Sequence, residues 1–174
     1  MTLTDVQQKF VLHWGEMGSR WGINRTVAQI HALLFIAPKP LNADDIAETL
    51  SVARSNVSTS LRELQGWGIA QAVPILGERK EHFTTQADVW EMFMAVLDER
   101  KKREVDPTLT LLRECVIEAA DAGKKEQHTH DRLSELLGLV EAMNAWYGQV
   151  RLLPQPMLIR FLKMGTKLKK LLGK

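Results

Sequence analysis

Between residues 42 and 65 the hydrophobic positions repeat at helical spacing in two short runs. The first run covers residues 42–50 and the second covers residues 53–65, with a turn at Ser51 and Val52 between them. This pattern predicts two short helices joined by a tight turn. The apolar residues that share one face of each helix are Ile46, Ala47 and Leu50, then Val57, Leu61 and Leu64.

Polar residues at the start of each run are typical of helix N-termini. Asn42 can cap the first helix, and the acidic Asp44 and Asp45 suit the positive end of the helix dipole. Ser51 is placed to cap the second helix. Glycines flank Trp67 just after the last apolar position, where glycine commonly ends a helix.

Two short strands with a polar turn between them are predicted next. Residues 69–75 have the pattern of one strand, residues 80–84 that of the return strand, and residues 76–79 that of the turn. A helix, a turn, a second helix and a hairpin in this order form a winged helix-turn-helix, a fold that places its second helix in the major groove of DNA. For the hairpin taken alone, a surface loop with solvated charges is the alternative.

The side of the second helix opposite its apolar face carries small polar and basic side chains. No acidic residue lies between Ser51 and Arg62, so nothing on this face repels phosphate. Hydroxyl, amide and guanidinium groups can hydrogen-bond base edges and phosphate oxygens, and basic residues at a wing tip can meet the backbone or the minor groove. The predicted DNA-contacting residues are Arg54, Ser55, Asn56, Ser58, Thr59, Ser60, Arg62, Arg79 and Lys80.

The remainder of the chain is predicted to be helical. Gly15, Gly18 and Gly22 mark a break after the first helix, and Pro107 ends the helix that begins at residue 87. These further helices are expected over residues 4–17, 24–37, 87–105, 108–122, 129–152 and 157–172.

The helices near the C-terminus carry more apolar surface than such thin elements can bury alone. A second subunit is the simplest partner, and a twofold dimer would present two recognition helices to two half-sites. Packing within the chain against residues 88–122 is the alternative, and the two can occur together. The apolar stripe consists of Leu133, Leu136, Leu137, Val140, Met143, Trp146, Tyr147 and Val150.

Two segments of this chain resemble the DNA-binding half of GbsR/MarR-type transcriptional regulators. The first is ALLFIAPKPLNADDIAETLSVARSNVSTSLRELQGWGIAQAV, followed by GERKEHF, and the second is FVLHWGEMGSRWGINRTVAQIHALL near the N-terminus. The clear match covers about residues 10–85. The resemblance implies a dimeric repressor or regulator with helices from both ends of the chain in the dimer interface. It also implies a possible response to choline or related osmoprotectants, which some members show.

Pattern and resemblance together predict a mainly α protein, with a winged helix-turn-helix domain, a small β-hairpin wing, and N- and C-terminal dimerisation helices. The expected divisions are a dimerisation helix over residues 1–23, a DNA-binding domain over residues 24–86, and a dimerisation and effector region over residues 87–174. We expect a homodimeric transcriptional regulator that acts as a repressor, binds double-stranded DNA and is modulated by a small-molecule effector such as a choline-like osmoprotectant.

Charge leaves a second function class open. Residues 1–87 contain eight basic and eight acidic residues, so the predicted DNA-binding domain has no net charge. DNA binding would then depend on a local positive face. The alternative is a winged-helix protein-interaction module that does not bind DNA. The final segment, residues 160–174, has six basic residues and no acidic one, and taken alone it is typical of a basic amphipathic helix on an anionic membrane or at DNA phosphate. In a winged-helix regulator, a place beside the dimer interface or the DNA is favoured.

The sequence has little to suggest an enzyme, a metal site or a membrane protein. It has no G-x-S-x-G, P-loop, dinucleotide or H-E-x-x-H motif, so we expect no catalysis and no cofactor. His128 and His130, on an expected loop, and the distant Cys115 lack the spacing of a zinc site. A single cysteine, no signal-peptide pattern and no membrane-length apolar run indicate the cytoplasm.

Five tryptophans are many for a chain of this length. Aromatic faces can enclose a quaternary ammonium ligand through cation–π attraction, which would suit a choline-like effector. Burial in cores and seams, the usual role of tryptophan, is the alternative and the more common one. The candidate effector-binding residues are Trp21, Trp67, Trp90, Trp146 and Tyr147.

Overall fold

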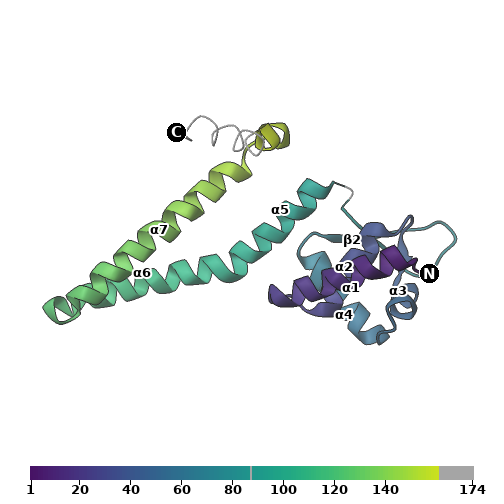
Figure 1. The fold of residues 1–174 in the computed structure, drawn as a ribbon, viewed down its shortest axis with the longest axis horizontal. Coiled ribbons are helices and arrows are strands. Elements are labelled where there is room, and N and C mark those ends of the chain that lie inside the picture. Colours follow the sequence, from purple (N-terminus) through teal and green to yellow (C-terminus); the bar gives the residue numbers. More distant parts are fainter. Residues whose placement is uncertain (87, 161–174) are drawn as a thin grey trace. The chain divides into compact units, whose positions relative to one another are not determined.

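The computed structural model describes residues 1–86 and 88–160 and divides the chain into two compact units (Figure 1). The first unit is Met1–Val96, and the second begins at Leu97. The helix predicted over residues 157–172 falls mostly outside the described residues, and so does the basic C-terminal segment. Both therefore stay predictions.

The first unit begins with two helices, each capped by the residue that precedes it. Thr4 precedes α1 (Asp5–Arg20), and its hydroxyl accepts a hydrogen bond from the Gln7 N–H at 3.3 Å. The Gln7 side chain in turn accepts from the Thr4 N–H at 3.0 Å, which completes a capping box. Asn24 precedes α2 (Arg25–Ile36), and its side chain accepts from the N–H two residues further on at 2.8 Å.

α1 runs past Met17, its predicted last residue, to Arg20, so Gly18 as well as Gly15 lies inside the helix, and both glycines face α2. A Cβ atom on Gly18 would lie 2.5 Å from the Cβ of Ala28, and one on Gly15 would lie 2.5 Å from the Cγ of Gln29. The two helices thus approach each other too closely for a side chain at Gly18, whereas a side chain at Gly15 would require the flexible side chain of Gln29 to move. Gly22 makes the actual turn, with a φ of 75° that glycine adopts without steric cost.

α3 (Ala43–Leu50) and α4 (Arg54–Gly66) form the predicted helix pair. Asn42 caps α3 as predicted, because its Oδ1 accepts from two N–H groups of the first turn at 2.9 and 3.0 Å. The prediction that Ser51 caps α4 is wrong. Ser51 instead ends α3, with a φ of 54° in the left-handed region. α4 follows Ala53 and has no side-chain cap.

A three-stranded antiparallel sheet joins the helix pair to the wing. β2 (Ala70–Val73) and β3 (His82–Thr85) form the predicted hairpin, in shorter strands than expected. β1 (Leu41–Asn42) pairs with the other edge of β3, with Leu41 opposite Phe83. A strand of two residues is too short to show an alternating pattern, so the sequence did not reveal it. β3 is the central strand and links the wing directly to the start of α3.

The core of the first unit is built around α2, most of whose residues are buried. Full burial of an aliphatic side chain stabilises a fold by roughly 1.5–3 kcal/mol relative to exposure. The helices and the sheet therefore hold together through the side chains that they share in this core. The largest fully buried side chains are Val27, Ile30, Leu33, Ile46, Val57, Leu64 and Ile69.

His31 of α2 is also buried, and its imidazole packs among apolar groups. Its Nε2 lies 3.0 Å from the Sδ of Met92, and its ring meets Trp14 edge-on with the ring centroids 6.0 Å apart. Burial lowers the pKa of His31 to about 4. The imidazole is therefore neutral at pH 7, and it joins α1, α2 and the start of α5 (Val89–Arg100) as a packing residue.

The helix predicted to end before Pro107 does not end there. A π-helical stretch, η1 (Lys101–Val105), runs directly into α6 (Asp106–Asp121), and Pro107 lies in the first turn of α6. Proline is tolerated in the first turn of a helix because the N–H groups there have no acceptor within the helix, so the N–H that proline lacks is not needed. Where the π-helical stretch changes to α-helix, the first turn of α6 begins without a break in the chain of helical residues.

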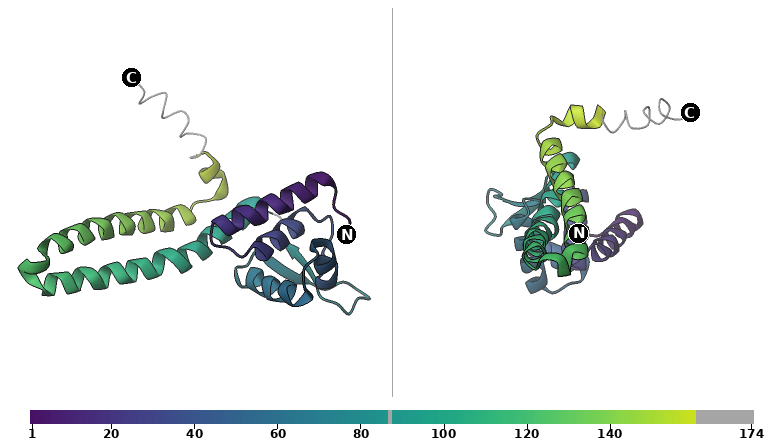
Figure 2. Two further views of the ribbon diagram at one scale, coloured as in Figure 1. Left: turned by 60° about the horizontal axis from the view of Figure 1, so that its bottom comes forward. Right: turned by 90° about the vertical axis from the view of Figure 1, so that its left-hand side faces the viewer.

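α6 and α7 (Gln127–Arg151) lie side by side and run in opposite directions, joined through a short 3-10 helix, η2 (Gly123–Glu126) (Figure 2). Asp98, near the end of α5, contacts α7 through two hydrogen bonds. Its carboxylate accepts from the Tyr147 hydroxyl at 2.6 Å and from the Arg151 Nε at 3.0 Å. Burial and the hydrogen bond to Asp98 raise the pKa of Tyr147 above its ordinary value. Tyr147 is therefore a structural contact of the hairpin.

The sites considered for metal binding have ordinary surroundings. His128 and His130 lie within α7, where a loop was expected, and Cys115 is half-buried on α6. No three His, Cys, Asp or Glu side chains within residues 1–86 and 88–160 gather closely enough to hold a metal ion. No helix in the same ranges is long and apolar enough to cross a membrane.

Replacing Gly18 with alanine should destabilise the first unit, because the new Cβ would meet the Cβ of Ala28, which cannot rotate away. We expect Gly18→Ala to lower the free energy of unfolding by about 1–3 kcal/mol, the usual cost of overpacking. Urea denaturation followed by circular dichroism would measure it. Gly15→Ala is the matched control, because the side chain of Gln29 is flexible and alanine favours a helix by roughly 1 kcal/mol over glycine. Equal losses in the two variants would contradict this account of the helix contact.

Candidate nucleic-acid interface

Most of the predicted DNA-contacting residues of α4 lie on its solvent side. Arg54, Ser55, Asn56, Thr59 and Arg62 are exposed, and Ser58 is half-buried. The exception is Ser60, whose exposed fraction is only 5%, so we leave it out of the proposed contact surface.

The apolar residues of α4 determine this arrangement. Val57, Leu61 and Leu64 are buried in the core and occupy one side of the helix. Ser55 and Thr59 lie four residues apart on the opposite side, and Arg62 continues the same side one turn later. The outward face therefore offers hydroxyl and guanidinium groups in a row, and Glu63, four residues after Thr59 and half-buried, is the acidic side chain of α4 that borders it.

The wing presents two cations beside this face. Arg79 and Lys80 lie in the loop between β2 and β3, and both are exposed. Gly77 turns the loop with a φ of 85°, a conformation that residues with a Cβ rarely adopt. Because β3 also pairs with β1, the base of the wing is fixed against the strand that leads into α3.

A groove of about 360 Å³ lies between α4 and the base of the wing. Both signs of charge line it, with Arg54, Arg62 and Lys80 opposed by Asp44 and Glu81. The surface predicted to meet DNA is therefore not uniformly positive. An anion that enters this groove meets two carboxylates as well as three cations.

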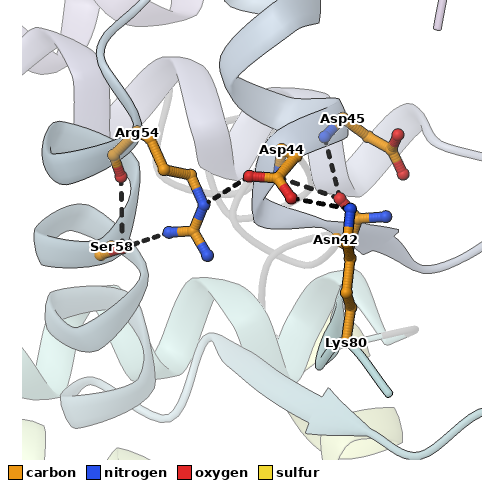
Figure 3. Close-up of polar contacts among 6 residues, drawn as sticks. All are labelled: Asn42, Asp44, Asp45, Arg54, Ser58 and Lys80. Atoms are coloured by element: carbon orange, nitrogen blue, oxygen red, sulfur yellow. Dashed lines mark hydrogen bonds and ion pairs between the residues drawn. The ribbon is translucent and has the colours of Figure 1, made fainter. Parts of the chain in front are cut away.

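Asp44 bridges α4 and the wing (Figure 3). Its Oδ1 accepts from the Arg54 Nε at 2.8 Å, and its Oδ2 lies 2.9 Å from the Lys80 Nζ. The Nη1 of Arg54 also donates to the Ser58 hydroxyl. The hydrogen bonds from Lys80 and Arg54 hold the pKa of Asp44 below its ordinary value, and the Asp44 carboxylate raises the pKa of Lys80.

Sequence reasoning assigned Asp44 to the first turn of its helix and overlooked this second role. Nothing in hydrophobic spacing or in a local motif could reveal it, since its two partners come from another helix and from the wing. Only the folded structure brings the Asp44 carboxylate next to Arg54 of α4 and Lys80 of the wing.

Arg62 and Arg79 differ from the two paired cations. Neither makes a hydrogen bond or an ion pair with any residue in the described part of the chain. Both side chains are exposed. Arg54 and Lys80 would have to break their ion pairs with Asp44 before binding phosphate, whereas Arg62 and Arg79 have no such pair to break.

The candidate effector residues are divided between the two units. Trp21, Trp67 and Trp90 belong to the first unit, whereas Trp146 and Tyr147 belong to the second.

The exposure of these rings also differs. Trp21 and Trp146 are 49% and 66% exposed, whereas Trp90 is half-buried and lies 5.8 Å from Phe93 between ring centroids. The hydroxyl of Tyr147 is engaged by Asp98. Trp21 and Trp146 are therefore the most accessible aromatic faces of the set.

Two repressors of Bacillus subtilis (strain 168) are similar to this chain, although no family model matches it. The HTH-type transcriptional repressor GbsR is 23% identical over 154 residues, which cover 84% of this chain and 85% of that protein. The HTH-type transcriptional repressor OpcR is 19% identical over 126 residues, which cover 72% of this chain and 68% of that protein. Both confirm the prediction of a transcriptional regulator rather than an enzyme.

A solved structure shares the fold. The crystal structure of a transcriptional regulator superimposes with a TM-score of 0.53 at 19% identity, covering 82% of this chain and 98% of its own. It confirms the predicted fold class, a mainly helical protein with a small antiparallel sheet. With the two similar repressors and the helix pair, sheet and wing described above, the chain is similar to transcriptional regulators of the GbsR/MarR type and shares their winged helix-turn-helix fold.

Proposed function

We propose that this regulator is a repressor that binds a specific DNA sequence, with α4 in the major groove and the wing on the adjacent backbone or minor groove. The observation that carries the proposal is the exposed polar face of α4, which has no acidic residue from Arg54 to Arg62 and shares a groove with Lys80 of the wing. The similarity to the repressors GbsR and OpcR supports repression as the outcome of binding. The predicted cytoplasmic location remains part of this proposal.

A homodimer is the second part of the proposal. No residue of α7 is buried within the described chain. Leu136, Leu139, Met143 and Trp146 are 47%, 59%, 61% and 66% exposed, and their spacing of three or four places them in one stripe. Exposed apolar stripes of this kind are typical of protein interfaces. A second copy related by a twofold axis would cover the stripe and would offer two α4 helices to two half-sites.

This proposal assigns functions to the same regions of the chain as the sequence predicted. Residues 24–86 would contact DNA, whereas residues 1–23 and 87–174 would supply the dimer contacts. The remaining residues of the predicted apolar stripe support this division. Leu133, Leu137 and Val140 are half-buried in the pair formed by α6 and α7. The outer stripe of α7, which consists of Leu136, Leu139, Met143 and Trp146, is exposed.

A choline-like effector is the third part of the proposal. It rests on the family resemblance and on the accessible rings of Trp21 and Trp146. An exposed aromatic face can attract a quaternary ammonium group, and several such faces together can enclose one. Binding that changed the separation of the two α4 helices would change the affinity for DNA.

A protein-interaction module that does not bind DNA is the alternative function. The zero net charge of residues 1–87 and the pairing of Arg54 and Lys80 with Asp44 favour it. The two functions differ in what the exposed face of α4 recognises, so they can be separated by variants on that face.

Purified protein should enrich a palindromic sequence from a random pool of DNA duplexes. Arg62→Ala and Arg79→Ala should each weaken binding to that duplex by about 10- to 100-fold, the usual effect of losing one base or phosphate contact. Arg62→Ala should also relax the sequence preference if Arg62 meets a base edge. Fluorescence anisotropy at several salt concentrations would measure both effects.

Arg20→Ala is the matched control, because Arg20 is an exposed arginine at the end of α1, outside α4 and the wing. Its affinity for the duplex should stay within about twofold of the wild type. Absence of any enriched sequence, with weak binding that is equal in all three variants, would favour the interaction module.

Placing a charge in the outer stripe of α7 should separate the two subunits. Met143→Glu should lower the dimer affinity by at least about tenfold, because it would bury a carboxylate in an apolar contact. Sedimentation equilibrium would measure this. Ala145→Glu adds the same charge at an exposed position two residues from Met143, on the other side of α7, and should leave the dimer intact. A wild-type chain that is monomeric at micromolar concentration would refute the dimer.

Choline and glycine betaine should change the tryptophan fluorescence of the protein and raise its melting temperature, since a ligand that binds only the folded state stabilises it. Trp21→Leu and Trp146→Leu should weaken the response if their rings contact the ligand. Unchanged emission and an unchanged melting temperature in the wild type would exclude both compounds as effectors.

A further inference from the structure

One carboxylate holds a cation from the recognition helix and a cation from the wing at the same time. Asp44 accepts from the Arg54 Nε at 2.8 Å and lies 2.9 Å from the Lys80 Nζ (Figure 3). The three side chains are about half exposed or more, so DNA can reach all of them. The bridge therefore stands on the surface where phosphate would bind.

A carboxylate and a phosphate bind the same groups of arginine and lysine. Exposed ion pairs exchange readily with solvent and with competing anions, because water and salt screen them. Non-specific binding to DNA draws its free energy almost entirely from cations that replace counterions at phosphates. While Arg54 and Lys80 are held by Asp44, they contribute little to that kind of binding.

The bridge also fixes the orientation of Arg54. Its Nε is held by Asp44 and its Nη1 by Ser58, whereas its Nη2 makes no hydrogen bond with the described residues. A guanidinium has five N–H donors in a rigid fork, so fixing one edge determines where the remaining donors point. An arginine held in this way loses less side-chain entropy when it meets a base edge.

We propose that Asp44 sets the specificity of DNA binding, because it withholds Arg54 and Lys80 from non-specific phosphates and orients Arg54 for the specific site. Asp44 is in this sense a positioning residue that acts through Arg54 and Lys80. The inference rests on the proposed DNA-binding function. It also gives the zero net charge of residues 1–87 a role, since the acidic residue that weakens general attraction to DNA improves discrimination.

Asp44→Asn tests the inference in the full-length protein, because asparagine keeps the shape of the side chain and removes its charge. Affinity for a scrambled duplex should rise by about tenfold, and the plot of log affinity against log salt should steepen by about one to two, since up to two cations are released. The ratio of affinities for the selected and scrambled duplexes should fall by about tenfold or more.

Asp45→Asn is the matched control. It removes the same charge from the same first turn of α3, but the Asp45 carboxylate belongs to neither ion pair. Its ratio of affinities should stay within about twofold of the wild type. A similar change in both variants would show that only the overall charge matters, and that result would overturn the inference.

Lys80→Ala separates the two partners of Asp44. In a Lys80→Ala background, Asp44→Asn should raise affinity for the scrambled duplex by a smaller factor than it does in the wild type, because one releasable cation is gone. Circular dichroism melts would show that each variant is folded.

The remaining outcomes are distinguishable. If the wild type selects a sequence and Asp44→Asn keeps the wild-type ratio and salt slope, the inference falls and the proposed function stands. If Asp44→Asn loses affinity for both duplexes alike, Asp44 is a structural support and the inference falls. If the wild type selects no sequence and binds no duplex, the proposed function falls and takes the inference with it.

Discussion

Burial of Val57, Leu61 and Leu64 determines which residues of α4 reach solvent. These side chains insert into the core around α2, and the helical repeat then directs the polar residues outward. Ser60 faces inward for the same reason, although its chemistry resembles that of its exposed neighbours. A shift of α4 by one residue would turn every polar side chain to a new direction, so the recognition surface depends on the packing beneath it.

Pairing of β1 with β3 extends this constraint to the wing. The strand leading into α3 and the return strand of the wing share backbone hydrogen bonds, and Asp44 adds a side-chain contact to Lys80 across the same region. The helix pair and the wing are therefore connected through both backbone and charge. Such a connection keeps the cations of the wing at a defined distance from those of α4, as recognition of a single DNA surface requires.

Local signals predicted the helix pair, the hairpin and the cap at Asn42, because periodicity and capping act within a few residues of one another. Tertiary contacts decided the rest. Gly18 proved to be a point of close helix approach rather than a break, and Ser51 ended one helix instead of starting the next. Pro107 was absorbed by a change of helical spacing. The bridging role of Asp44 was invisible for the same reason, since its partners are distant in sequence.

The loop that joins β2 to β3 lies outside the register of the sheet, because the pairing ends at Val73 and His82. Residues can therefore be inserted into or deleted from this loop without sliding β3 along β1. The two surfaces proposed to meet DNA can then diverge independently in evolution. Loop length would adjust how far the wing extends, while substitutions on α4 would change the preferred operator, and neither change would require the other.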